Sequence, residues 1–134
     1  MTRFVVASIA ALALSGCAKT TIDSSITQAP AVAPTTTLPS GPIDVLLPRL
    51  VEEAGKLSDK IGSNDHKNEQ ISLIENLWNA VRPQIVDHDG VAALNFDGAI
   101  ELCQKGERFN RPADADKCFR NLAALADSYL ADNP

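Results

Sequence analysis

From residue 43 onward, apolar residues recur at steps of three and four, the spacing that places side chains on one face of an α-helix. The first such stretch consists of Leu47, Leu50, Ala54, Leu57 and Ile61. The second and most regular stretch consists of Ile71, Ile74, Trp78, Val81 and Ile85, widened by Leu77. Each stretch predicts an amphipathic helix whose apolar face packs into a core. Trp78 is interpreted as the main packing residue of that face, with ligand stacking as the alternative.

Two weaker patterns follow and predict a third and a fourth helix. The third helix is expected to bury Ala92, Phe96, Ala99 or Ile100, and Cys103. The fourth is expected to bury Cys118, Leu122, Leu125 and Tyr129, flanked by Phe119 and Ala126. No alternating β pattern of useful length occurs from residue 43 to residue 134. Because short connections favour antiparallel neighbours, these residues are predicted to form an all-α, up-down four-helix bundle.

Capping and breaking residues predict where the first two helices begin and end. Asp44 or Ser40 is the expected cap of the first helix, and Gly62 its expected stop. Pro83 lies inside the second apolar stripe, where proline removes a backbone hydrogen bond. Since the stripe continues to Ile85, we expect a kinked helix rather than a break.

The boundaries of the last two helices rest on glycine and proline. Gly98 interrupts the third pattern and is expected to permit close contact between helices. The run ending at Gly106 predicts the end of the third helix, followed by a loop over residues 107–111. Pro112 predicts the start of the fourth helix, with Asp114 and Asp116 in the first turn, where negative charge is favourable.

The N-terminus has a different pattern, one typical of an export signal. Arg3 precedes an apolar run over residues 4–14, and small residues follow. A helix that spans a bilayer needs about 20 apolar residues, so this run is too short to remain in the membrane. The run ends in Leu14-Ser15-Gly16-Cys17, which resembles the lipobox of bacterial lipoproteins.

The resemblance implies that Cys17 carries a diacylglyceryl group and that a signal peptidase cuts between Gly16 and Cys17. Two or more acyl chains give durable attachment to a membrane. The chain is therefore expected to be anchored by lipid to the cell membrane or the outer membrane, on its extracytoplasmic side. An ordinary secretory signal with a chance cysteine is the alternative.

Residues 17–42 are predicted to be a disordered linker that joins the anchor to the domain. The stretch over residues 29–39 is rich in proline and threonine and has no charged residue. Such a composition favours extended polyproline II conformations, at about 3.1 Å per residue. The sequence thus divides into a signal peptide (residues 1–16), a lipidated linker (residues 17–42) and a helical domain (residues 43–134).

Cys103 and Cys118 are expected to form a disulfide. Once Cys17 is acylated they remain as a pair, and disulfides persist in exported proteins. One lies late in the third helix and the other early in the fourth, so an antiparallel hairpin brings them together. The alternative is a metal site completed by His66 and His88, although close Cys-x-x-Cys spacing is absent.

The charge of the chain bears on its partners. It has 17 acidic and 12 basic residues, and from residue 43 onward there are 16 acidic and 10 basic residues. The basic stripe typical of a nucleic-acid binder is absent, so no nucleic-acid partner is expected. No sequence motif indicates a cofactor.

The densest polar cluster is Asp87-His88-Asp89-Gly90. Its carboxylates and imidazole have the chemistry to bind a cation or to move a proton. It fails the EF-hand template, because Ile85 and Phe96 would occupy ligand positions. The cluster is interpreted as a solvated turn between helices, and a small envelope enzyme or a cation-binding protein that uses it is the alternative function.

Arg108, Phe109 and Arg111 form the candidate contact surface, since a rigid loop with arginines and an aromatic residue is typical of binding elements. An ordinary connecting loop is the alternative. The sequence contains no motif of a catalytic triad or a phosphate-binding loop. The leading hypothesis is therefore a membrane-anchored interaction module, not an enzyme, that binds another envelope protein or a small ligand. A structural spacer is a further alternative.

Overall fold

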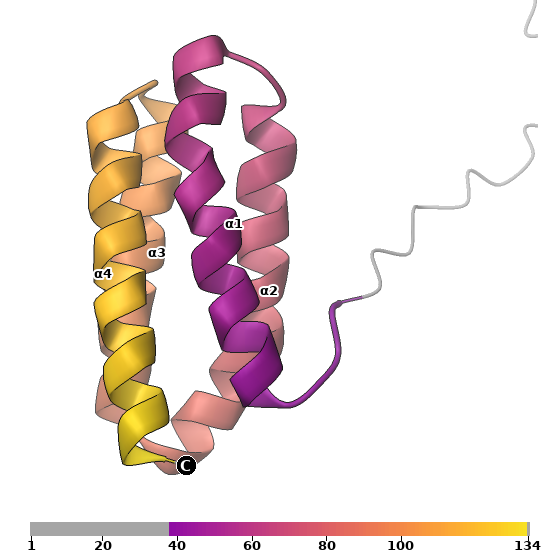
Figure 1. The fold of residues 1–134 in the computed structure, drawn as a ribbon, viewed down its shortest axis with the longest axis vertical. Coiled ribbons are helices and arrows are strands. Elements are labelled where there is room, and N and C mark those ends of the chain that lie inside the picture. Colours follow the sequence, from indigo (N-terminus) through magenta and orange to yellow (C-terminus); the bar gives the residue numbers. More distant parts are fainter. Residues whose placement is uncertain (1–37, 134) are drawn as a thin grey trace, which may run out of the picture. The chain divides into compact units, whose positions relative to one another are not determined.

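The computed structural model describes residues 38–133, and within them it contains four helices and no strand. The helices are α1 (Ile43–Ser63), α2 (Lys67–His88), α3 (Gly90–Arg108) and α4 (Pro112–Asp132). Successive helices run in opposite directions, and α4 packs on α1 to close the bundle (Figure 1). The prediction of an all-α, up-down four-helix bundle is confirmed.

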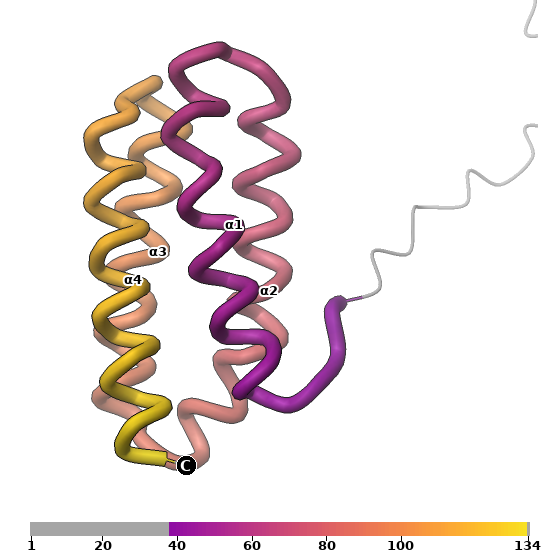
Figure 2. Tube along the Cα trace, viewed as in Figure 1, coloured from indigo at the N-terminus to yellow at the C-terminus, as the bar shows by residue number. Residues whose placement is uncertain are grey.

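The two ends of the bundle are formed by different segments of the chain (Figure 2). The Asp89 end contains the starts of α1 and α3 and the ends of α2 and α4. The Phe109 end contains the α1–α2 turn and the α3–α4 loop.

The core is built from one face of every helix. All the positions predicted for the first two helices are buried, namely Leu47, Leu50, Ala54, Leu57, Ile61, Ile71, Ile74, Leu77, Trp78, Val81 and Ile85. The Trp78 ring is 4% exposed and stacks on Phe96, with 5.5 Å between ring centroids. The interpretation of Trp78 as a packing residue is therefore confirmed.

The inner faces of α3 and α4 are rotated slightly from the predicted ones. Ala93 is buried in α3, whereas Ala92 is only half-buried, and in α4 Ala126 is buried where Leu125 is half-buried. Alanine is only weakly hydrophobic, so an apolar stripe through Ala92 and one through Ala93 fit the sequence almost equally well. The predicted inner positions Ala92 and Leu125 lie instead at the edge of the α3–α4 interface.

The ends of the first two helices differ in part from the prediction. Neither Ser40 nor Asp44 caps α1; its cap residue is Pro42, whose carbonyl accepts from two backbone N–H groups at 3.1 Å. The helix also continues past Gly62 to Ser63, and Asn64 caps it with a φ of 53°. Asparagine tolerates this left-handed conformation, so a glycine is not needed. Helix α2 continues through Pro83 without a break, as expected.

The predicted end of α3 at Gly106 is wrong, because the helix runs on to Arg108 and Gly106 is buried within it. A Cβ atom at Gly106 would lie 2.9 Å from the backbone nitrogen of Ala115 in α4. At Gly98, a Cβ atom would meet nothing within 4 Å. The close contact between helices is thus at Gly106 and not at Gly98.

These two glycines yield a paired prediction about stability. Gly106→Ala should lower the free energy of unfolding by about 1–3 kcal/mol, because the added methyl group meets backbone that cannot move independently. Gly98→Ala should raise it by about 1 kcal/mol through helix propensity alone. Urea unfolding of both variants measures the difference, and stabilisation by both substitutions would contradict the close contact.

Candidate functional site

The α3–α4 loop that presents the candidate contact surface is held in shape by backbone hydrogen bonds. Phe109 N–H donates to the Lys105 carbonyl at 3.0 Å, and Arg111 N–H donates to the Gly106 carbonyl at 2.7 Å. Between them, Asn110 takes a φ of 54°, a conformation that asparagine tolerates. The loop is three residues long, shorter than predicted, since Arg108 still belongs to α3.

Two contacts tie this loop to the rest of the bundle. Cys103 and Cys118, both fully buried, form the predicted disulfide between α3 and α4, with 5.2 Å between their Cα atoms. From α2, the ammonium group of Lys67 donates to the side chain of Asn110 at 3.2 Å and to the carbonyl of Glu107 at 3.4 Å. The loop is therefore held in place by the disulfide between α3 and α4 and by the hydrogen bonds that Lys67 donates.

The fold brings Arg108, at the end of α3, together with Phe109 and Arg111 of this loop. The Phe109 ring is 54% exposed. The guanidinium carbons of Arg108 and Arg111 lie 5.5 Å and 5.3 Å from its centroid, which is within cation–π range. Arg111 also lies 3.7 Å from a carboxylate oxygen of Asp114, whereas no ion pair joins Arg108 to a carboxylate in residues 38–133.

A hollow of about 250 Å³ adjoins this surface, and Glu101, Gln104, Lys105, Arg108 and Phe109 line it. Lys105 pairs with Glu101 at 2.8 Å on its wall. The surface thus combines an exposed aromatic ring, unpaired positive charge and a shallow hollow next to a rigid loop.

The polar cluster Asp87-His88-Asp89-Gly90 is an exposed junction between helices. Asp87 and His88 belong to the last turn of α2, and Asp89 alone separates that helix from α3. One carboxylate oxygen of Asp89 accepts from the backbone N–H groups of Val91 and Ala92, both at 2.9 Å. Asp89 therefore caps α3, which agrees with the interpretation of this cluster as a turn.

The residues of the alternative metal site are far apart. His66 precedes α2 and His88 ends it, so about 33 Å of helix separates them. Both cysteines of the domain are in the disulfide. Within residues 38–133, no group of three or more His, Cys, Asp and Glu side chains is placed to hold a metal ion.

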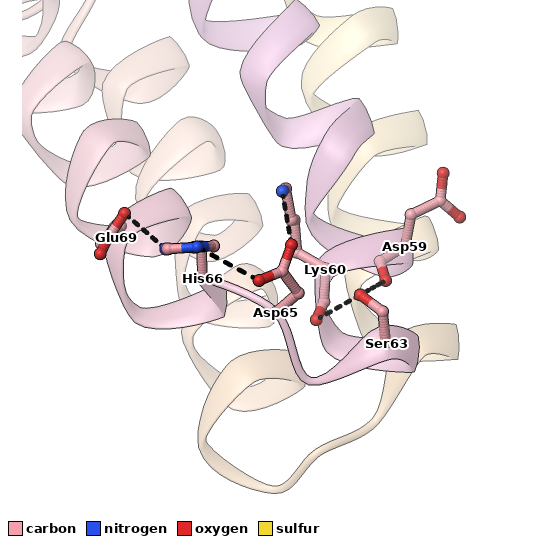
Figure 3. Close-up of polar contacts among 6 residues, drawn as sticks. All are labelled: Asp59, Lys60, Ser63, Asp65, His66 and Glu69. Atoms are coloured by element: carbon pink, nitrogen blue, oxygen red, sulfur yellow. Dashed lines mark hydrogen bonds and ion pairs between the residues drawn. The ribbon is translucent and has the colours of Figure 1, made fainter.

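His66 instead belongs to an exposed charge cluster at the α1–α2 turn (Figure 3). Its ring nitrogens lie 2.9 Å from Glu69 and 3.2 Å from Asp65, and Asp65 also pairs with Lys60 at 3.4 Å. The hydrogen bond to Glu69, with the charges of both carboxylates, raises the pKa of His66. These side chains are in solvent, so the cluster is a surface feature of the turn.

A second polar network, which sequence reasoning missed, joins α2 to α3. Arg82 donates three hydrogen bonds to the two carboxylate oxygens of Asp97, and the Trp78 indole donates a fourth at 2.9 Å. The Arg82 hydrogen bonds, with that of Trp78, lower the pKa of Asp97. No local spacing could reveal this network, because the residues come from two helices and pair only after packing.

The predicted lipidation site Cys17, the cleavage site and most of the linker lie outside the described residues. In the part of the chain that is described, no helix is both long and apolar enough to cross a membrane. No protein-family model, curated protein or solved structure gives a significant match to this chain. The contact surface on the α3–α4 loop is therefore argued from its own geometry.

Proposed function

We propose that this chain is a lipid-anchored, extracytoplasmic interaction module. The anchor is Cys17, and the bundle binds another envelope protein through Arg108, Phe109 and Arg111. The sequence pattern that ends at Cys17 supports the anchor. The exposed Phe109 ring, with two guanidinium groups in cation–π range of it, is the observation that carries the binding role.

Phe109 has the properties of a binding anchor because it is exposed without being mobile. Its backbone is held by the loop hydrogen bonds and by the disulfide beneath. A partner that covers the ring therefore gains apolar contact at a small cost in conformational entropy. Aromatic and arginine side chains are the residues that most often dominate binding energy at protein interfaces.

The charge distribution indicates the chemistry of the partner. No ion pair joins Arg108 to a carboxylate within residues 38–133, and Arg111 has only a long one, at 3.7 Å, to Asp114. Arg108 and Arg111 both lie close to the ring, where they would pair with carboxylates of the partner. We therefore expect the partner to present an acidic segment with an apolar residue at its centre.

Site-specific photocrosslinking in the native cell tests this proposal. A benzophenone side chain in place of Phe109 should join the chain to one discrete envelope protein. The same replacement at Phe119 is the matched control, because Phe119 is also partly exposed but packs on Gly55 of α1. The crosslink should be lost when Arg108 and Arg111 are both replaced by glutamine.

The same sample tests the anchor. The mass of the chain recovered from membranes should correspond to residues 17–134 plus acyl chains. Crosslinks of equal yield from both positions, or none from position 109, would overturn the binding role. A recovered chain without acyl groups would overturn the anchor and leave the binding role to be judged on the crosslinks.

A further inference from the structure

A second hollow lies between α3 and α4 at the Asp89 end, close to the point marked C in Figure 1. Its volume is about 200 Å³. The apolar side chains of Ala92, Phe96 and Leu125 line it, together with Asp89, Tyr129 and Asp132. It is separate from the contact surface at the Phe109 end and shares no residue with it.

Tyr129 supplies a polar group to this hollow. Its side chain is 6% exposed, and its ring meets Phe96 edge-on at 6.4 Å. The hydroxyl makes no hydrogen bond within residues 38–133 and is not sealed from solvent, and Tyr129 lines both this hollow and a neighbouring one lined by Gln84 and His88. A buried phenol normally has a hydrogen-bond partner, and here the place for that partner is open.

The residues that line the hollow include two aspartates and no lysine, arginine or histidine. One carboxylate oxygen of Asp89 caps α3, and the other makes no hydrogen bond or ion pair with a described residue. Asp132 likewise has no ion pair in the described part of the chain. The sequence has no lysine or arginine over residues 89–104 or residues 121–133. Burial and the charge of Asp89 together raise the pKa of Tyr129, so its hydroxyl remains protonated at neutral pH.

We propose that this hollow binds a small organic ammonium ion. The apolar part of the ligand would lie on Ala92 and Leu125, and its ammonium group would donate to the carboxylates of Asp89 and Asp132. The Tyr129 hydroxyl accepts a further hydrogen bond from the ammonium group. A carboxylate or phosphate ligand would be repelled by the same two aspartates. This site does not depend on the proposed role of Phe109.

Ligand-observed fluorine NMR on the full chain tests the proposal with two probes of nearly equal shape. The probes are para-fluorobenzylammonium and its neutral counterpart, para-fluorobenzyl alcohol. The ammonium should bind at least about tenfold more tightly, the effect of one or two ion pairs in a partly buried site. Equal affinity of the two probes, or no binding of either, would overturn the proposal.

Three variants locate the binding within the fold. Asp89→Asn with Asp132→Asn should weaken binding of the ammonium about tenfold while the fold is kept, because asparagine caps a helix as well as aspartate does. Tyr129→Phe should weaken it without a change in ring packing. Asp127→Asn is the matched control, because it removes a carboxylate from the same end of α4 outside the hollow. Loss of binding in the control equal to that in the double variant would show general attraction to acidic surface and overturn the site.

Discussion

Phe96→Ala should lower the free energy of unfolding by about 3–5 kcal/mol, the largest effect we expect from a single substitution in this chain. Phe96 is fully buried and joins two aromatic neighbours, with Trp78 stacked at 5.5 Å and Tyr129 edge-on at 6.4 Å. The cavity would lie where α2, α3 and α4 meet, so no single helix can move to fill it. A domain of this size has a total stability of about 5–15 kcal/mol.

Thermal unfolding followed by circular dichroism measures this loss. The midpoint should fall by at least about 12 °C, given that 1 kcal/mol shifts a domain of this size by about 4–8 °C. Phe109→Ala is the control, because it removes the same ring from a position that is 54% exposed. That variant should cost less than about 1 kcal/mol. Similar losses in the two variants would mean that the aromatic cluster does not organise the core.

The first two helices were predictable because their apolar residues are large and regularly spaced. In α2, the series from Ile71 to Ile85 contains only large side chains, and each of them is buried. A shift of one position would expose most of them, so the pattern permits one orientation only. Helix α3 contains alanines on both sides of its inner face, and there the pattern left two neighbouring orientations nearly equal.

Gly106 illustrates a limit of local signals. Glycine marks the end of a helix, but it also allows two helices to approach closely, and sequence alone does not separate these two uses. Here the second use applies, because the Ala115 backbone lies where a side chain would be. Only the packing of α4 on α3 reveals the difference.

The two candidate sites also differ in how far the sequence alone predicts them. Arg108, Phe109 and Arg111 are nearly consecutive, so their proximity follows from sequence, although the stacking of both guanidinium groups on one ring does not. The hollow beside Tyr129 joins Asp89 to Asp132, which are far apart in the chain. It exists because the start of α3 and the end of α4 meet at one end of the bundle, and no spacing rule predicts that.

Reduction of the disulfide should lower the free energy of unfolding by about 3 kcal/mol, as the chain-entropy model gives for a loop of this length. Cys103 and Cys118 are 15 residues apart, and their bridge closes the segment that includes the contact surface. Both thiols would remain buried after reduction, so packing is retained and the crosslink alone is lost. Urea unfolding with and without reductant should therefore show a lower midpoint in the reduced chain.

The double variant Cys103→Ala, Cys118→Ala separates the two contributions of these residues. It lacks the crosslink and also leaves small cavities, so it should be less stable than the reduced chain. Reductant should not change its midpoint further, which excludes an effect through Cys17. If full reduction, verified by thiol titration, left the midpoint of the unmodified chain unchanged, the bridge would not stabilise the fold. The rigidity of the α3–α4 loop would then depend only on the hydrogen bond from Lys67 to Asn110 and on the backbone hydrogen bonds within the loop.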